Sequence, residues 1–289
     1  MTMKTLRENG RRKFTGLAGG VALLVVGVFG GADALAGVAD TKHNLGTNPQ
    51  NVNASATFSG TGEICVFCHT PHAADTAAVV PLWNRNISSP PTYQTYDALG
   101  TSTLDGKTAT VGSVSLACLS CHDGTQAMNS VINAPGSGLT GDATWTGGTW
   151  SGAGQDGTGK MNPARVAMLG TDLRNDHPIG IQYAGGGYST TALTGPGADP
   201  DFIAATNAVL GAGRVWWVDT GGANRQKTDM ILYTRTNATA TVASGGGTIT
   251  GTQPFVECAS CHDPHSSTNP TFLRLSNVGS AVCLACHIK

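Results

Sequence analysis

Near its C-terminus the chain reads Cys258-Ala259-Ser260-Cys261-His262-Asp263-Pro264-His265 and then Cys283-Leu284-Ala285-Cys286-His287. This stretch holds two C-x-x-C-H pentapeptides. The same pentapeptide occurs earlier, at Cys65-Val66-Phe67-Cys68-His69 and at Cys118-Leu119-Ser120-Cys121-His122. All 8 cysteines fall into these four pairs, and each pair is followed by one of only 8 histidines among 289 residues. Composition does not explain this pattern, which we number in chain order as the first to fourth motif.

The fixed histidine distinguishes these motifs from other uses of C-x-x-C. Such a pair alone suits a redox dithiol, half of a zinc site or a disulfide framework, and two pairs can supply the four thiolates of structural zinc. C-x-x-C-H is instead the attachment sequence of c-type haem, in which the thiols bond to the porphyrin and the histidine binds the iron. We therefore predict four haem c groups attached at Cys65, Cys68, Cys118, Cys121, Cys258, Cys261, Cys283 and Cys286, with proximal ligands His69, His122, His262 and His287.

Four histidines lie outside the motifs, which equals the number of sixth iron ligands required. They are His43, His72, His177 and His265. His72 and His265 each follow a proximal histidine by three residues. At this spacing neither can reach the opposite face of its own haem iron, but each is well placed to bind the iron of a neighbouring haem. We predict bis-histidine ligation at each haem, with Met128, Met161, Met168 and Met230 as alternative thioether ligands. Filled coordination leaves no open iron, so we expect electron transfer rather than an enzyme.

The N-terminus has the layout of an export leader. A basic segment with five Lys or Arg precedes an apolar run at 17–31 and the A-x-A sequence Ala34-Leu35-Ala36. This run is short for a membrane-spanning helix. We predict a cleaved signal peptide at 1–36 and an exported protein without a permanent membrane anchor, a retained anchor being the alternative. Without residues 1–36, 12 Lys and Arg remain against 16 Asp and Glu, a net charge of −4 that argues against nucleic acid as a partner.

Composition bounds the fold class. The chain has 40 glycines and only 6% aromatic residues, and periodic helices are hard to find. We expect a multihaem cytochrome c fold: a mostly irregular chain, with short helices at the motifs and a few hairpins, wrapped around four haems. Residues 202–211 are the best further helix candidate. Alternating Thr, Val and Ile at 231–250 predict a hairpin around Gly245-Gly246-Gly247.

The two halves of the chain share an order of parts. A lone histidine leads C-x-x-C-H-x-P-H and then a second C-x-x-C-H in each half, although the spacings differ. We interpret this order as a duplicated dihaem module, and convergence on useful haem-site residues is the alternative. The predicted organisation is a first dihaem module at 37–133, a Gly/Thr-rich insert at 134–170 and a second dihaem module at 171–289.

With these residues in view, the chain resembles exported multihaem c-type cytochromes of metal-respiring bacteria, and among them the OmcE-like tetrahaem cytochromes that form extracellular nanowires. The matching stretches are Lys42-His43-Asn44-Leu45, Ile64–His72, Leu82-Trp83-Asn84-Arg85, Cys118–Thr125, Asp176-His177-Pro178-Ile179 and 257–287.

The resemblance implies an extracellular or cell-surface filament that passes respiratory electrons to other redox proteins or external acceptors. In that family a histidine of one subunit can complete a haem of the next. If His177 reaches back to the first module, His43 would serve the preceding subunit of a head-to-tail homopolymer. We assign His72 to the second haem and His265 to the fourth. A soluble periplasmic carrier and a haem reductase with an open iron are the alternatives.

Overall fold

A computed structural model describes residues 37–87, 89–139, 145–222 and 224–288. The predicted signal peptide at 1–36 lies outside these residues. Chain contacts group Ala36–Lys289 into a single unit, and the module boundaries at 133/134 and 170/171 stay predictions. No helix in the described ranges is long and apolar enough to cross a membrane.

Short helices form at the motifs, as the sequence predicts. Helix α1 (Ser113–His122) contains the second motif, α2 (Cys258–Cys261) the third, and α3 (Ala281–Leu284) begins the fourth. The first motif is a single turn in which the His69 amide donates to the Cys65 carbonyl at 2.8 Å. A helical turn places residues three and four apart on one face, so both sulfurs and the imidazole of each motif face the same side.

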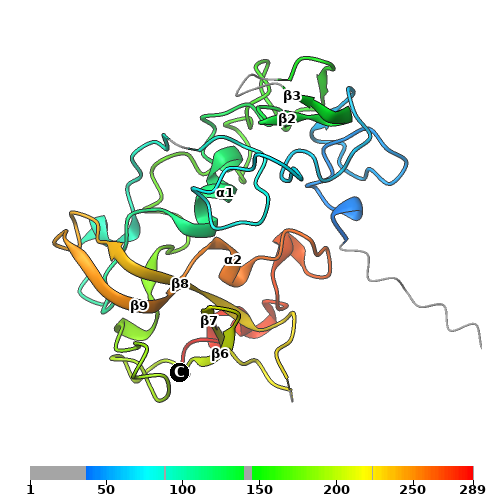
Figure 1. The fold of residues 1–289 in the computed structure, drawn as a ribbon. Coiled ribbons are helices and arrows are strands. Elements are labelled where there is room, and N and C mark those ends of the chain that lie inside the picture. The colour runs from blue at the N-terminus through cyan, green and yellow to red at the C-terminus, as the bar shows by residue number, and fades with distance from the viewer. Residues whose placement is uncertain (1–36, 88, 140–144, 223, 289) are drawn as a thin grey trace, which may run out of the picture. The chain divides into compact units, whose positions relative to one another are not determined.

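The longest regular element is an antiparallel five-stranded sheet in the order β5-β9-β8-β7-β6 (Figure 1). Its strands are β5 (Ile181–Gln182), β6 (Thr206–Leu210), β7 (Gly213–Val218), β8 (Met230–Thr239) and β9 (Thr248–Val256). The β8–β9 pair confirms the predicted hairpin. The helix predicted at 202–211 is wrong, because Thr206–Leu210 is a strand that pairs with β7, with Asn207 opposite Trp216.

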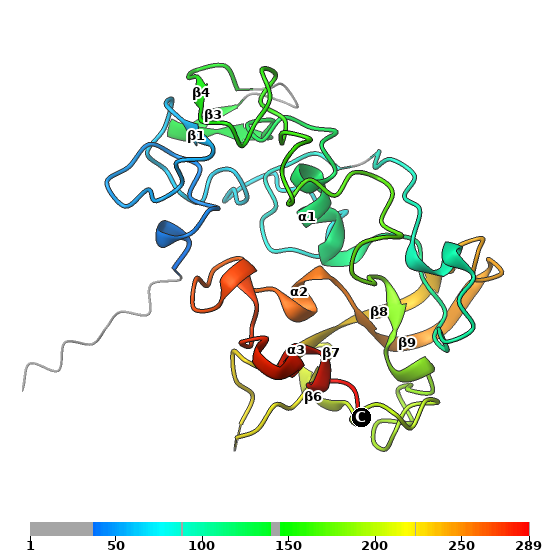
Figure 2. The same ribbon diagram turned by 180° about the vertical axis from the view of Figure 1, so that it is seen from behind.

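A side-chain core lies against this sheet. Trp216, Val218 and Met230 are fully buried and cluster with Tyr183, Tyr188 and Leu232, and α3 contributes its neighbour Ala285 to the same cluster. Figure 2 shows α3 beside β6 and β7. Trp216 and Met230 therefore serve packing, and this half of the chain has an apolar core of its own that composition did not lead us to expect.

The rest of the chain is irregular. Two small sheets pair β1 (Thr57–Phe58) with β4 (Trp150–Ser151) and β2 (Asn133–Ala134) with β3 (Gly138–Leu139). Both involve the Gly/Thr-rich insert at 134–170. The 3-10 turns are Gly37–Asp40, Tyr96–Leu99, Pro135–Ser137, Tyr183–Gly185, Pro270–Phe272 and Val278–Ser280. An aromatic cluster of Phe58, Phe67, Trp145 and Trp150 supports the first motif from this side.

Candidate haem-binding site

Backbone carbonyls orient three of the four proximal histidines. The Nδ1 atom of His69 lies 2.8 Å from the Pro81 carbonyl oxygen. The Nδ1 atom of His122 lies 2.7 Å from the Ala167 carbonyl oxygen, and that of His262 lies 2.7 Å from the Thr271 carbonyl oxygen. Because a carbonyl only accepts, Nδ1 carries the proton and Nε2 keeps its lone pair. Metal-binding histidines are held in this way, so these rings fit an axial ligand.

Two of the proximal rings face a second imidazole. The ring centroids of His69 and His265 are 6.2 Å apart with planes 16° from parallel. Those of His122 and His43 are also 6.2 Å apart, with planes at 76°. An imidazole nitrogen binds a transition metal at about 2 Å and lies roughly 1 Å from the ring centre, so two imidazoles on opposite faces of one metal have centroids roughly 6 Å apart. Both pairs fit an iron held between two histidines.

A further histidine, His177, lies near the proximal ring of His262. Burial lowers the pKa of the His262 imidazole, the hydrogen bond to the Thr271 carbonyl opposes this, and the charge of His177 lowers the pKa further. Burial also lowers the pKa of His122, and it lowers the pKa of His43 to about 4. A lowered pKa keeps each imidazole neutral at physiological pH, which is the form that binds a metal.

His287 and His72 remain without an imidazole partner in the part of the chain that the structure describes. The His287 ring lies against Phe202, with centroids 4.2 Å apart. The side chain of His72 is exposed, and only its carbonyl oxygen takes part in hydrogen bonds, from Thr70 and Asn133. One proximal histidine therefore has an apolar neighbour where the others have an imidazole. One spare histidine, His72, is exposed, as His177 and His265 are, but has no imidazole nearby in the described residues.

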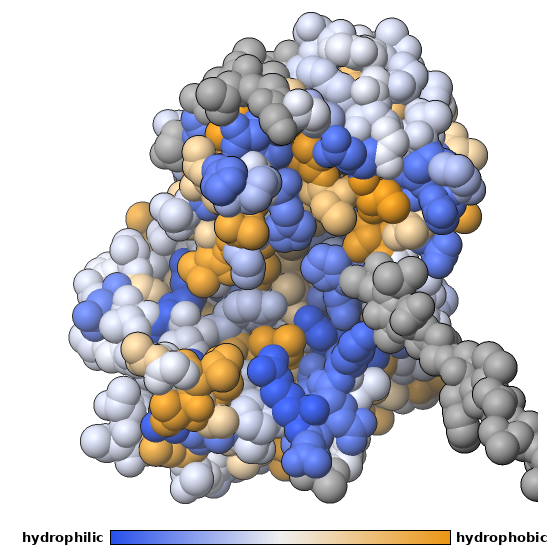
Figure 3. All heavy atoms as spheres, turned by 45° about the vertical axis from the view of Figure 1, so that its right-hand side comes forward, coloured by the Kyte–Doolittle hydropathy of each residue, from blue (hydrophilic) through white to orange (hydrophobic). Residues whose placement is uncertain are grey.

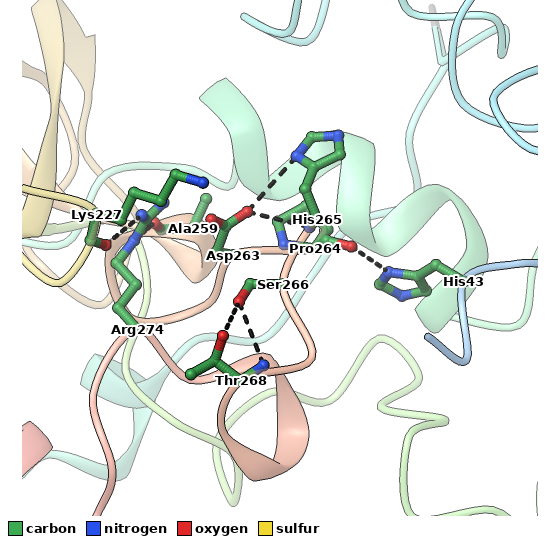
Figure 4. A network of polar contacts seen from close by, with 9 residues as sticks. All are labelled: His43, Lys227, Ala259, Asp263, Pro264, His265, Ser266, Thr268 and Arg274. Atoms are coloured by element: carbon green, nitrogen blue, oxygen red, sulfur yellow. Dashed lines mark hydrogen bonds and ion pairs between the residues drawn. The ribbon is translucent and has the colours of Figure 1, made fainter. Parts of the chain in front are cut away.

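These pairings differ from the distal assignments made from the sequence, which stay predictions. His265 lies beside His69 and not at the fourth motif, and His43 occupies the place beside His122 that was assigned to His72. Within this chain His43 lies against His122, and its role in another subunit stays a prediction. Tertiary packing holds His43 there: its Nδ1 lies 3.4 Å from the Pro264 oxygen (Figure 4), and its ring stacks on Phe272 at 4.4 Å. His177 lies near enough to His262 for its charge to act on that imidazole, and its reach to the first module stays a prediction.

The cysteines show which motifs are neighbours in space. The backbone amide of Cys258 donates to the hydroxyl of Ser115 in α1 at 3.1 Å, which places the third motif beside the helix of the second. Burial, followed by the charge of Cys121, raises the pKa of the Cys68 thiol to about 12. Burial also raises the pKa of the Cys261 thiol, and the charge of Cys283 adds to this rise while Arg274 opposes it. The second and third attachment sites are therefore neighbours, and the charge effects bring Cys68 near Cys121 and Cys261 near Cys283.

Apolar surface accompanies the outer motifs. Val79 and Leu82 are exposed next to the first motif, and Val278 and Leu284 are exposed at the fourth. On one face of the molecule, hydrophobic side chains gather in several groups between hydrophilic ones (Figure 3). Apolar patches of this kind mark binding surfaces, and an apolar macrocycle would cover them. No group of three or more His, Cys, Asp or Glu side chains suited to one metal ion occurs in the described ranges.

Three consecutive residues that sequence reasoning did not assign connect the first two motifs. The Trp83 ring meets the His69 ring edge-on at 6.2 Å. The Asn84 side-chain amide donates to the carbonyls of Val66 at 2.7 Å and Asn133 at 2.8 Å. Arg85 is fully buried and hydrogen-bonds to α1. Only the resemblance of Leu82-Trp83-Asn84-Arg85 to a family stretch marked them.

A buried carboxylate, also missed, joins the second and third motifs. Glu257 immediately precedes Cys258, and its side chain is 0% exposed. It accepts a 2.5 Å hydrogen bond from the Ser115 hydroxyl of α1, and it lies 3.5 Å from the Arg235 guanidinium without hydrogen-bond alignment. Burial raises the pKa of Glu257 to about 7, although Arg235 and Ser115 act in the opposite direction.

Comparison with protein families matches residues 253–289 to the doubled CXXCH motif. The matched segment contains the third and fourth motifs, so the chain carries a feature of multihaem c-type cytochromes and supports covalently bound haem c there. No curated protein matches the chain.

Proposed function

We propose that the protein transfers electrons through four covalently bound c-type haems. The observation that carries this proposal is the pair of facing imidazoles, His69 with His265 and His122 with His43, each at 6.2 Å. Opposed imidazoles close both faces of an iron and leave no position for a substrate. The bound haem supplies a centre that gains and loses one electron.

The chain's own residues hold the ligands and set the route. Carbonyl oxygens of Pro81, Ala167 and Thr271 fix the proximal rings, which keeps ligand reorganisation small when charge changes. The bond between Cys258 and Ser115 of α1 brings the second and third sites together. We infer that electrons pass along the four sites in sequence order.

The two histidines left without an imidazole partner lead to a proposal for assembly. We propose that the exposed His72 of one copy completes the fourth haem, bound through His287, of the next copy. Because donor and acceptor are different residues of the chain, such a contact is head-to-tail and generates an open filament unless the rotation closes. This replaces the role first given to His43. The homopolymer would act outside the cell or at its surface, exchanging electrons with redox proteins or external acceptors.

Two alternatives follow from the same observation. If His72 stays unused, the protein is a soluble periplasmic tetrahaem carrier. If the iron above His287 keeps an open position beside Phe202, that haem can bind small molecules, as in a haem reductase.

The test compares secreted wild-type protein with His72→Ala. We expect wild-type protein to carry four covalent haems by mass spectrometry, to form filaments in electron micrographs and to bind no carbon monoxide. His72→Ala should give monomers in which one haem binds carbon monoxide. His177→Ala is the matched control, since it should open a haem without preventing assembly. Filaments of the His72→Ala variant would refute the polymer contact, and fewer than four haems in the wild type would refute the tetrahaem proposal.

A further inference from the structure

We infer that Arg85 is a buried cation that raises the reduction potentials of the haems at the first and second motifs. This inference rests on the proposed function, because it assumes haem at these sites. It assigns a role in electron transfer to a residue outside the C-x-x-C-H motifs and outside the histidine ligands.

The guanidinium of Arg85 is fully buried and makes hydrogen bonds with all three of its nitrogens. Nε donates to the Ser120 hydroxyl at 3.0 Å, and Nη2 donates to the Ser120 carbonyl at 2.8 Å. Further bonds go to the carbonyls of Met128 and Ala127, both at 2.9 Å, and to the Gln126 amide oxygen at 3.3 Å. Every one of these partners is a neutral oxygen.

No carboxylate forms an ion pair with Arg85 in the ranges that the structure describes. The closest acidic residue in sequence to its partners is Asp123, whose carboxylate is occupied by the Tyr93 hydroxyl at 2.7 Å and by Thr125. A guanidinium cannot lose its proton in a protein. Arg85 is therefore a permanent positive charge whose field is not cancelled by a paired anion.

This charge lies between two attachment sites. Ser120, which accepts two of its bonds, sits inside the second motif next to Cys121. On the other side the preceding residue, Asn84, donates its amide to the Cys68 carbonyl at 2.9 Å, and the charge of Arg85 reaches the Cys68 side chain. The first two haems would thus be bonded to sulfurs on either side of one guanidinium.

A buried cation favours reduction of its neighbours. One-electron reduction of a bis-histidine haem removes one positive charge, and no bond to the chain forms or breaks. Removing a positive charge next to Arg85 relieves repulsion, so the reduced form is favoured and the potential rises. Because the guanidinium is buried, salt screens this effect less than it would a surface charge. The third and fourth motifs have no contact with Arg85, so we expect the effect to be confined to two haems.

Arg85 also has a structural role, which the test must separate. Its bond to the Ser120 carbonyl satisfies one of the free carbonyls in the last turn of α1, which ends at His122. Loss of that bond lowers stability in any variant. A reduction potential, in contrast, responds to the charge.

The experiment is a spectroelectrochemical titration of the four-haem protein, with dithionite as the electron donor. Arg85→Met should lower two of the four potentials, changing the ferric/ferrous equilibrium constant at least tenfold, or 59 mV for one electron. Arg85→Lys keeps the charge and should stay within threefold of the wild type. Lys107→Met removes an exposed cation and is the matched control.

A second variant tests the charge without disturbing α1. Gln126→Glu places a carboxylate of nearly the same shape at the 3.3 Å contact and keeps Arg85 in place. It should lower the same two potentials, so the inference can be tested even if Arg85→Met does not fold. Unchanged potentials in Gln126→Glu, or equal shifts in Arg85→Met and Arg85→Lys, would overturn the inference. A wild-type protein without haem at the first two motifs would overturn the proposed function instead.

Discussion

Glu257 should make the protein less stable as the pH rises through the weakly acidic range. Its carboxyl is buried between α1, α2 and β8, 3.5 Å from the Arg235 guanidinium, and its charge also acts on the Tyr233 phenol. Burial raises its pKa from 4.5 to about 7. Between these values the folded state holds a proton that the unfolded chain has released, so unfolding becomes easier as the pH rises.

The size of the effect follows from the shift. At about 1.4 kcal/mol per pKa unit, a rise from 4.5 to about 7 corresponds to a loss of about 3 kcal/mol in the free energy of unfolding. The contribution is fully present below the unfolded pKa and is lost above the folded one. The side chain is 0% exposed, so no reduction for solvent screening is needed.

The perturbation is Glu257→Gln, which replaces the titrating group with a neutral one of the same size. We expect the difference in unfolding free energy between wild type and variant to change by about 3 kcal/mol between about pH 4.5 and pH 7. Guanidinium chloride unfolding of the haem-loaded protein, followed by far-ultraviolet circular dichroism, measures it. Glu63→Gln, at an exposed site, is the control. A difference that stays constant over this range would refute the reasoning.

Three further outcomes test the site and its support. Asn84→Ala should lower the unfolding free energy by about 3 kcal/mol, because three side-chain hydrogen bonds of about 1 kcal/mol each are lost. Denaturant titration measures this loss, with the exposed Asn175→Ala as the control, and an Asn84→Ala variant as stable as the wild type would contradict it. Trp216→Ala should cost about 4 kcal/mol by emptying the sheet's core, measured in the same way against the exposed Val209→Ala. His265→Ala should leave the haem at His69 open to carbon monoxide, visible as a shifted Soret band; failure to bind the gas would contradict the pairing of these rings.

Local features were predictable from the sequence and tertiary ones were not. The turns at the motifs follow from the spacing of cysteine and histidine, and the β8–β9 hairpin follows from alternating residues around three glycines. The run at 202–211 was misassigned because a short apolar stretch fits a helix as well as a strand, and only pairing with β7 decides between them.

The sequence shows that there are enough histidines for four pairs, but it does not show which histidine lies beside which. His43 is brought to His122 by a packing contact with Pro264 and Phe272, residues far away in sequence, and no local pattern encodes it. Arg85 was missed for a related reason. A single arginine in an irregular segment gives no sign of burial, which arises only when the loop at 126–128 folds over it.

The bond between Cys258 and Ser115 of α1 separates the length of the proposed electron path from the length of the polypeptide. The chain leaves the second attachment site after His122 and returns to the third at Cys258, after the Gly/Thr-rich stretches and most of the sheet. If haems occupy these sites, the intervening segment can change in length or surface without moving the two haems apart. The surface of such a protein can therefore diversify while the arrangement of its haem attachment sites stays the same.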